Sequence, residues 1–169
     1  MTRPTAALPI IERRRIEAEF AKALYDELVP EIGRDRARAI LARAVESMAR
    51  AAGAAMAAED RATLGTADLS TFRDRLALWA ANDALTLEVV ESTPDRLAFN
   101  VTRCRYAETY RAMGVQEIGD VLSCNRDGEF ICGYRPDARF TRSQTIMQGA
   151  SHCDFRYSLP ERGTAEMPE

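Results

Sequence analysis

The chain has 169 residues, of which 46% are hydrophobic, and this is enough for one domain with a buried core. Its formal net charge is −3, and neither half is basic enough to indicate a nucleic-acid-binding protein. The N-terminus lacks the apolar segment of a signal peptide, and no apolar run is long enough to cross a bilayer. We therefore expect a cytoplasmic protein with neither a membrane nor nucleic acid as partner.

The first half of the sequence has the apolar spacing of helices. Residues 10–29 carry an apolar side chain at every fourth position, which predicts one apolar stripe on a helix that Pro30 ends: Ile16, Phe20, Leu24 and Leu28.

Two more helices are predicted before position 85. Residues 35–60 carry an alanine-rich apolar face, in which Gly53 is a weak point. Residues 66–84 follow, with Thr66 or Asp68 as the N-cap and Trp79 in the core. The alanine-rich helices also fit a homo-oligomer in which the N-terminal helices of two copies pair.

At Leu85 the pattern changes to that of strands. Residues 85–92 and 96–103 are rich in β-branched side chains and are separated by Thr93-Pro94-Asp95, which predicts a hairpin. If the second strand continues, alternation places Cys104 on its more polar face, with Asn100.

Residues 105–114 and 115–124 return to helical spacing. Turn-forming residues dominate positions 123–128 and predict a turn that presents Cys124 and Asp127 together. Two further strands are predicted at residues 139–147 and 153–159.

The predicted class is therefore α+β, with N-terminal helices packed on a small, largely antiparallel four-stranded sheet. We expect a single domain over residues 1–159, with a helical part (10–84) and a sheet and motif part (85–159). The polar residues 160–169 are predicted to be a disordered tail.

The side chains capable of nucleophilic or soft-ligand chemistry are concentrated late in the chain. All four cysteines and the only histidine lie beyond position 103: Cys104, Cys124, Cys132, His152 and Cys153. Their spacing matches neither a zinc ribbon nor a Cys-x-x-Cys redox motif, which disfavours a thiol redox protein. A functional cluster would have to be assembled by the fold.

Three short blocks within residues 85–159 carry a family resemblance: Cys104-x-Tyr106-x-Glu108, Cys124-x-x-Asp127 and Gly149-x-x-His152-Cys153-Asp154-Phe155. In these blocks the sequence resembles the L-2-amino-thiazoline-4-carboxylic acid hydrolase family. The resemblance implies a small bacterial enzyme that opens the ring of 2-amino-thiazoline-4-carboxylate to give N-carbamoyl-L-cysteine, or that acts on another cyclic amidine or amide.

That reaction needs an activated nucleophile, a proton donor and an anchor for the substrate carboxylate. In the preferred scheme no cofactor is required and a thiolate, that of Cys104, attacks directly; the candidate catalytic residues are Cys104, Asp127, His152 and Cys153. In the alternative scheme a zinc ion supplies the attacking water and is held by Cys104, Cys124, Asp127 and Cys153, or with His152 in place of the carboxylate. Several thiolate ligands would acidify that water less, which disfavours the zinc scheme.

Arginine side chains are candidates for the carboxylate anchor, because a guanidinium pairs with a carboxylate bidentately. The candidate substrate-binding residues are Asn100, Arg103, Arg105, Tyr106, Arg142 and Arg156.

Simpler interpretations remain open for these residues. Cys124 and Cys153 also fit packed thiols, Asp127 an ordinary turn and His152 a hairpin cap. A different function is open as well: a non-enzymatic sensor domain that binds a small ligand and contains a structural metal.

Overall fold

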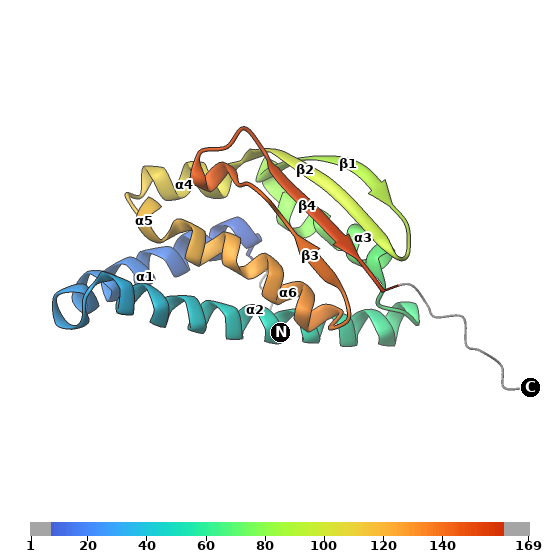
Figure 1. Cartoon of the computed structure of the whole chain (residues 1–169), viewed down its shortest axis with the longest axis horizontal. Coiled ribbons are helices and arrows are strands. Elements are labelled where there is room, and N and C mark those ends of the chain that lie inside the picture. Colours follow the sequence, from blue (N-terminus) through green and yellow to red (C-terminus); the bar gives the residue numbers. More distant parts are fainter. Residues whose placement is uncertain (1–7, 161–169) are drawn as a thin grey trace, which may run out of the picture.

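The computed structural model describes residues 8–160 and places a four-stranded sheet against a layer of helices (Figure 1). The helices before the sheet are α1 (Ile10–Ile32), α2 (Arg34–Leu64) and α3 (Leu69–Ala80), and those after its first hairpin are α4 (Arg105–Ala112), α5 (Gln116–Gly119) and α6 (Asn125–Tyr134). The strands are β1 (Leu85–Ser92), β2 (Arg96–Cys104), β3 (Arg139–Thr141) and β4 (Cys153–Ser158). The predicted α+β class is confirmed, and all but the first residue of the predicted tail, residues 161–169, lies outside the described residues.

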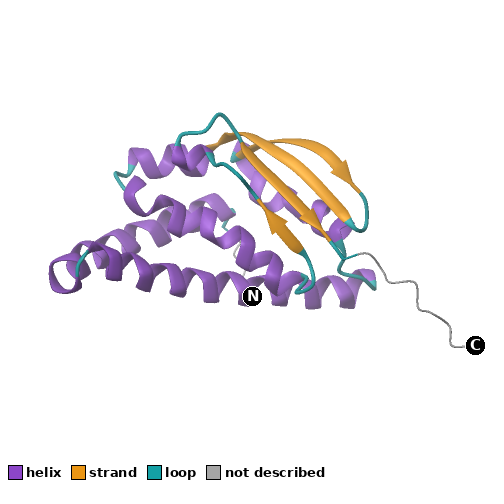
Figure 2. Ribbon diagram, in the orientation of Figure 1, coloured by secondary structure: helices purple, strands orange, loops and turns teal. Residues whose placement is uncertain are grey.

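The sheet is antiparallel throughout and has the order β1-β2-β4-β3. The β1–β2 hairpin is confirmed, with Thr93 N–H donating to the Arg96 carbonyl at 2.8 Å. Alternate residues of β2 and β4 are buried on the side that faces the helices, among them Phe99 and Phe155, whose rings stack at 4.7 Å. Figure 2 shows the sheet on one side and the long helices on the other.

The strand predicted at 139–147 is mostly absent, since β3 ends at Thr141. The next backbone N–H groups, of Ser143 and Gln144, both donate to the Asp154 carboxylate at 2.9 Å. Because these donors are used by a side chain, they are not available to a strand ladder. A 3₁₀ turn, Ile146–Gln148, follows instead.

The prediction that Pro30 ends the first helix is wrong. Proline removes one helical N–H and clashes with the preceding turn, but Pro30 lies in the last turn and α1 continues to Ile32. The helix ends at Gly33, which has a φ of 82° and donates its N–H to the Val29 carbonyl at 2.9 Å. A positive φ favours glycine at this position.

The apolar stripe predicted on α1 lies on its exposed side: Ile16 is 48% exposed, Phe20 73% and Leu24 39%. We call these three residues the α1 stripe. The packed side of the helix instead uses Ala18 and Ala21, whose small side chains let α1 lie close to its neighbours. The sequence therefore identified the helix but not the side that packs.

Helix α2 is unbroken, and Gly53 is a point of close packing rather than of weakness. A Cβ atom at Gly53 would lie 2.0 Å from the Phe130 carbonyl oxygen of α6. One at Gly133 would lie 2.0 Å from the Arg50 carbonyl oxygen of α2. The two backbones thus touch where the helices cross. A large part of the alanine-rich face of α2 therefore packs against α6 of the same chain.

The third predicted helix begins as expected and ends early. The Asp68 carboxylate accepts from the N–H groups of Ser70 and Thr71, at 2.9 and 3.0 Å, which makes it the N-cap. Helix α3 ends at Ala80 and is followed by a 3₁₀ turn, Ala81–Asp83.

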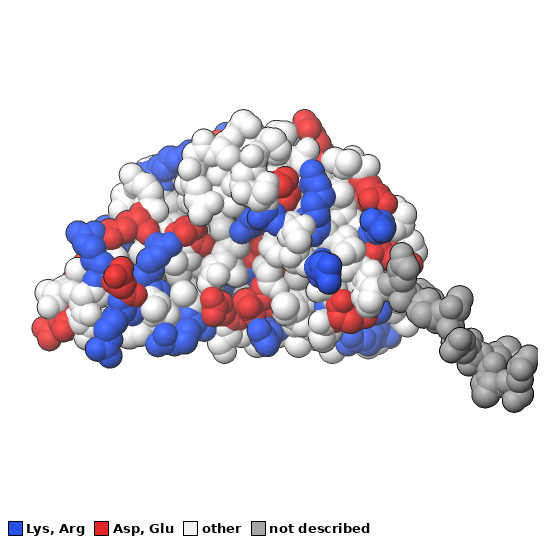
Figure 3. All heavy atoms as spheres, in the orientation of Figure 1, with Lys and Arg blue, Asp and Glu red and all other residues white. Residues whose placement is uncertain are grey.

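Acidic and basic side chains are interspersed on the face of the molecule shown in Figure 3. Within residues 8–160, no helix combines the length and the hydropathy that a bilayer crossing requires.

Replacing Gly53 by alanine tests the helix crossing. The added methyl group has no room beside the Phe130 carbonyl, so α2 and α6 must separate. We expect the melting temperature to fall by about 5 °C or more, measured by circular dichroism.

The matched control is Gly128→Ala on α6, where the added Cβ would meet only the Phe140 ring at 3.3 Å. Both variants gain helix propensity, so only the clash distinguishes them. Equal melting temperatures for the two variants would contradict the close crossing.

Candidate functional site

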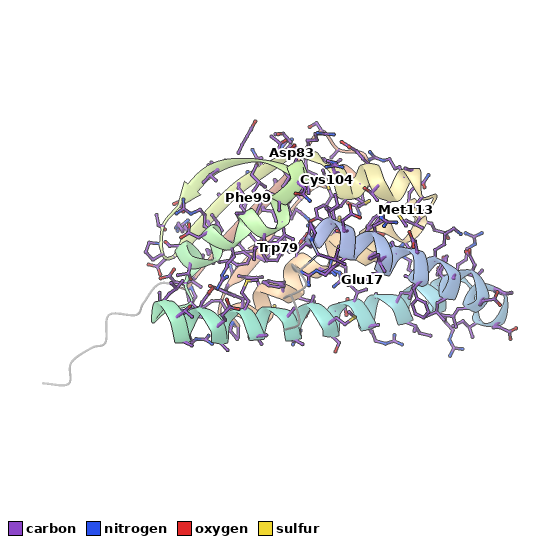
Figure 4. The ribbon with its side chains drawn as sticks, turned by 180° about the vertical axis from the view of Figure 1, so that it is seen from behind. Glu17, Trp79, Asp83, Phe99, Cys104 and Met113 are labelled. Carbon is purple, nitrogen blue, oxygen red and sulfur yellow. The ribbon has the colours of Figure 1, made fainter. Side chains whose placement is uncertain are left out.

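Two adjoining cavities lie between the inner face of the sheet and the helices. One has a volume of about 80 Å³ and is lined mainly by apolar side chains, several of them aromatic, including Phe72, Trp79 and Phe130; we call it the aromatic cavity. The other has a volume of about 70 Å³ and is lined by Cys104, Cys124 and Cys153 among others; we call it the thiol cavity. Figure 4 shows Phe99, Trp79 and Cys104 between the sheet and the helical layer.

The two cavities share walls. Both are lined by the same seven residues: Arg14, Trp79, Leu85, Val101, Arg126, Asp127 and Phe155. A small ligand in the thiol cavity could therefore place an apolar substituent in the neighbouring aromatic cavity.

Cys104 reaches the thiol cavity because of a β-bulge. Thr86 pairs with Arg103 and Leu87 pairs with Val101, so Thr102 has no opposite residue. The extra residue reverses the alternation and puts Cys104 on the inner face with Val101. The prediction that Cys104 shares a face with Asn100 is therefore wrong.

Cys124 and Asp127 lie on continuous helix rather than on the predicted turn. Cys124 ends a π-helical segment, Asp120–Cys124, which runs directly into α6. Residues three positions apart share one side of a helix, and both side chains line the thiol cavity. The expectation that they are presented together holds, although by a different local structure.

Asp127 is the carboxylate of the thiol cavity, and its charged partner is Arg142. The Arg142 guanidinium forms an ion pair with Asp127 and also donates to the Cys124 carbonyl at 3.0 Å. It lies over the Phe155 ring, 5.1 Å from the centroid. Burial raises the pKa of Asp127 to about 6, although Arg142 acts to lower it.

The thiols of this cavity are held in the neutral form. Burial raises the pKa of Cys104 to about 11 and also raises the pKa values of Cys124 and Cys153. Cys153 additionally accepts the Ile146 N–H at 3.2 Å. The site therefore contains a carboxylate with a pKa of about 6 beside three protonated thiols.

Tyr106 is the other predicted site residue that lines the thiol cavity. Its hydroxyl donates to the Trp79 carbonyl at 3.0 Å, which joins α4 to the end of α3. Burial raises its pKa, so the phenol is a neutral hydrogen-bonding group.

Sequence reasoning missed two arginines, Arg14 of α1 and Arg126 of α6, which line both cavities. Both bind the Glu17 carboxylate, at 2.6 and 2.8 Å. In the sequence, Arg14 and Glu17 look like an ordinary surface pair three residues apart on a helix, so no local signal marks them.

Five of the predicted residues lie away from the cavities. Arg156 donates to Asn100 Oδ1 at 3.0 Å on the outer face of the sheet. Arg103 pairs with Glu108 at 2.9 Å, and Arg105 donates to the Asn82 carbonyl at 2.6 Å. His152 contacts Gln144 and Ser151 and lines neither cavity.

The described part of the chain, residues 8–160, contains no group of three His, Cys, Asp or Glu side chains that could hold a metal ion. The zinc ligand set of Cys104, Cys124, Asp127 and Cys153 is therefore not preformed there, and zinc binding stays a prediction.

A larger polar groove adjoins the thiol cavity. Its volume is about 440 Å³, and Cys124 and Arg142 line both spaces. Arg38 and Asp120 form an ion pair on its wall. Cys124 and Arg142 therefore lie between the thiol cavity and this wide, charged groove.

Residues 13–157 match the sequence profile of the L-2-amino-thiazoline-4-carboxylic acid hydrolase family. The chain belongs to this family. The match extends from α1 to the end of β4, so it includes the helical half, where the three motifs gave no signal. No curated protein matches the sequence.

Solved structures show the same fold in proteins of other kinds. The phenol-responsive sensory domain of the transcription activator PoxR with phenol has 15% sequence identity and a TM-score of 0.52, over 90% of this chain and 82% of that one. A trafficking protein particle complex subunit 3 from Naegleria fowleri, covalently bound to palmitic acid, has 12% identity and a TM-score of 0.50, over 88% and 96%. At this identity the likeness extends to the fold alone.

The raised thiol pKa values predict slow alkylation of the native protein. At about 11, the pKa of Cys104 is about 2 above its ordinary value of 9.0. The thiolate fraction at pH 8 is then roughly a hundredth of that in the unfolded chain. We expect iodoacetamide to modify native Cys104 at least about 100-fold more slowly than the same residue in denaturant.

Digestion at acidic residues isolates Cys104 in the peptide 96–108 for mass spectrometry. Equal alkylation rates in the native and unfolded protein would contradict a buried, neutral thiol.

Proposed function

We propose that this chain is a hydrolase that opens a small cyclic amidine or amide, such as 2-amino-thiazoline-4-carboxylate, in the thiol cavity. One observation carries the proposal: the thiol cavity contains a carboxylate, Asp127, with a pKa of about 6. A general base or acid is most effective when its pKa is near the working pH. Membership of the hydrolase family supports the same reaction class.

The charges of the site fit a zwitterionic substrate. Asp127 and Arg142 form an ion pair in the described structure. A substrate with a carboxylate and an amidinium group would offer one partner to each: its carboxylate to Arg142 and its amidinium to Asp127. These partly buried charges would then remain paired when the substrate separates Asp127 from Arg142.

In the proposed reaction Asp127 handles the proton in both steps. A water molecule forms a C–O bond to the amidine carbon and gives a proton to the Asp127 carboxylate. The C–S bond of the ring then breaks, and the departing sulfur takes that proton from Asp127. This leaves a thiol and a protonated urea, which gives the extra proton brought in by the amidinium to solvent. The products are then a thiol and a neutral urea, and Asp127 is ionised again.

This scheme gives water, rather than Cys104, the role of nucleophile. Moving a proton from Cys104, with a pKa of about 11, to Asp127, with a pKa of about 6, is unfavourable by roughly 10⁵. Attack by a Cys104 thiolate, the preferred scheme from the sequence, therefore needs a substrate-induced change in the site. The neutral thiols instead fit apolar walls around the substrate ring.

The variant Asp127→Asn tests the proposal. An amide still accepts from Arg142 but does not take a proton, so we expect kcat to fall by about 10²–10⁴. The assay follows N-carbamoyl-cysteine by chromatography after incubation with 2-amino-thiazoline-4-carboxylate. In the wild type, kcat/KM should fall about tenfold per pH unit below about pH 6, because the base must be ionised.

Asp137→Asn is the matched control, since Asp137 pairs with Arg135 and lines neither cavity. Full turnover in Asp127→Asn would rule out the proposed base. Loss of turnover in Cys104→Ser alone, with Asp127→Asn active, would favour the thiolate scheme.

A second function, binding of a small apolar ligand without turnover, is favoured by the aromatic cavity. Trp79 and Phe130 pack edge to face there, with ring centroids 5.1 Å apart. The fold is shared with a sensory domain described with phenol. In this alternative the thiol cavity would hold the polar end of a ligand and Asp127 would bind rather than catalyse.

Trp79 offers a direct readout, because it is the only tryptophan and lines both cavities. At high concentration we expect 2-amino-thiazoline-4-carboxylate to change its fluorescence in Asp127→Asn, which keeps Arg142 but lacks the charge partner of the amidinium, and which should bind more weakly and without rapid turnover. A response to phenol combined with no response to the thiazoline would favour the sensor.

A further inference from the structure

The α1 stripe is an apolar surface that the described residues leave uncovered. Ile16, Phe20 and Leu24 are each between 39% and 73% exposed. Comparison of Figures 1 and 4 shows α1 along the outside of the helical layer. Scattered exposed apolar residues are ordinary, but a continuous row along one helix is typical of a contact surface.

The row is flanked by two opposite charges without partners among the described residues. Arg13 and Glu27 are both exposed, and neither makes an ion pair or side-chain hydrogen bond within residues 8–160. Other charges of α1, such as Lys22 and Asp26, are paired within the helix. Among the described residues, Arg13 and Glu27 therefore lie unpaired at the two ends of the apolar row, and Glu31, one turn beyond Glu27, has no such partner either.

The arrangement is symmetric about Phe20. Ile16 and Leu24 each lie four residues from Phe20, and Arg13 and Glu27 each lie seven residues from it. At roughly 100° per residue, all five fall within an arc of roughly 80° on the helix. An antiparallel copy of the same helix would thus match hydrophobic to hydrophobic and opposite charge to opposite charge.

We propose that a second copy of this chain binds here, with two α1 helices antiparallel across a two-fold axis at Phe20. Phe20 then contacts the partner's Phe20, and Ile16 contacts the partner's Leu24. Arg13 pairs with the partner's Glu27, and the two-fold axis makes this pair occur twice. The self-complementary charges favour a second copy over an unrelated partner, which would have no need of the symmetry.

The dimer would fix the helix that carries Arg14, which lines both cavities from another side of α1. Each copy keeps its own complete cavities, so the inference does not depend on the proposed reaction. The apolar row and its flanking charges extend over about 21 Å of helix, which is small for a stable interface. Dimer and monomer should therefore exchange with concentration.

Sedimentation equilibrium of the full chain over a concentration series tests the proposal. The wild type should form dimers, and Phe20→Glu should raise the dissociation constant by roughly 100-fold or more. Arg13→Glu and Glu27→Arg should each raise it by about tenfold at low salt, because each places like charges opposite one another twice. The double variant Arg13→Glu/Glu27→Arg should restore it to near the wild-type value.

Lys22→Glu is the matched control: it makes the same kind of charge change on the opposite side of α1 and should leave the dissociation constant unchanged. Circular dichroism checks that each variant is folded. A wild type that is monomeric at every concentration, or that captures only a different protein, would overturn the proposal. So would a dimer unaffected by Phe20→Glu, or a double variant weaker than both single variants.

Discussion

The close crossing of α2 and α6 sets the position of the candidate site. Gly53 and Gly133 leave the two backbones in direct contact, so α6 lies deep between α2 and the sheet. Because α6 carries Arg126, Asp127 and Phe130, this depth decides that those side chains reach the cavities. A wider crossing would move the carboxylate away from the thiols.

The pKa of Asp127 reflects burial, which raises it, and three arginines that lower it: Arg142 most strongly, then Arg126 and Arg14. Burial alone disfavours its charged form, and these arginines offset part of that effect, which leaves a pKa of about 6. Burial raises the pKa values of all three cysteines; Arg142 acts to lower those of Cys124 and Cys153, but burial outweighs it and the thiols remain neutral. One cavity thus contains acids with well-separated pKa values, and this separation assigns the proton-transfer role to the carboxylate.

The same fold is found in a sensory domain and in a trafficking subunit, so the layer of helices over an antiparallel sheet does not specify a reaction. What distinguishes these functions is the content of the space between the layers. In this chain that space has an aromatic part and a part with titratable groups, joined by shared walls. The proposed hydrolase and the ligand-binding alternative each rely on a different part.

The sequence was enough to predict the α+β class, the hairpin and the family, because apolar periodicity and short motifs are local signals. It also placed Cys104, Cys124, Asp127, Cys153, Tyr106 and Arg142 among the candidates, and all six line one cavity. Only the tertiary structure decided that His152 and Arg156 lie elsewhere, and that Arg14 lines both cavities. The reason is physical: a bulge at Thr102, the close approach of two helices at Gly53 and the choice of the packed side of α1 each depend on contacts between distant segments. Local periodicity contains no information about such contacts.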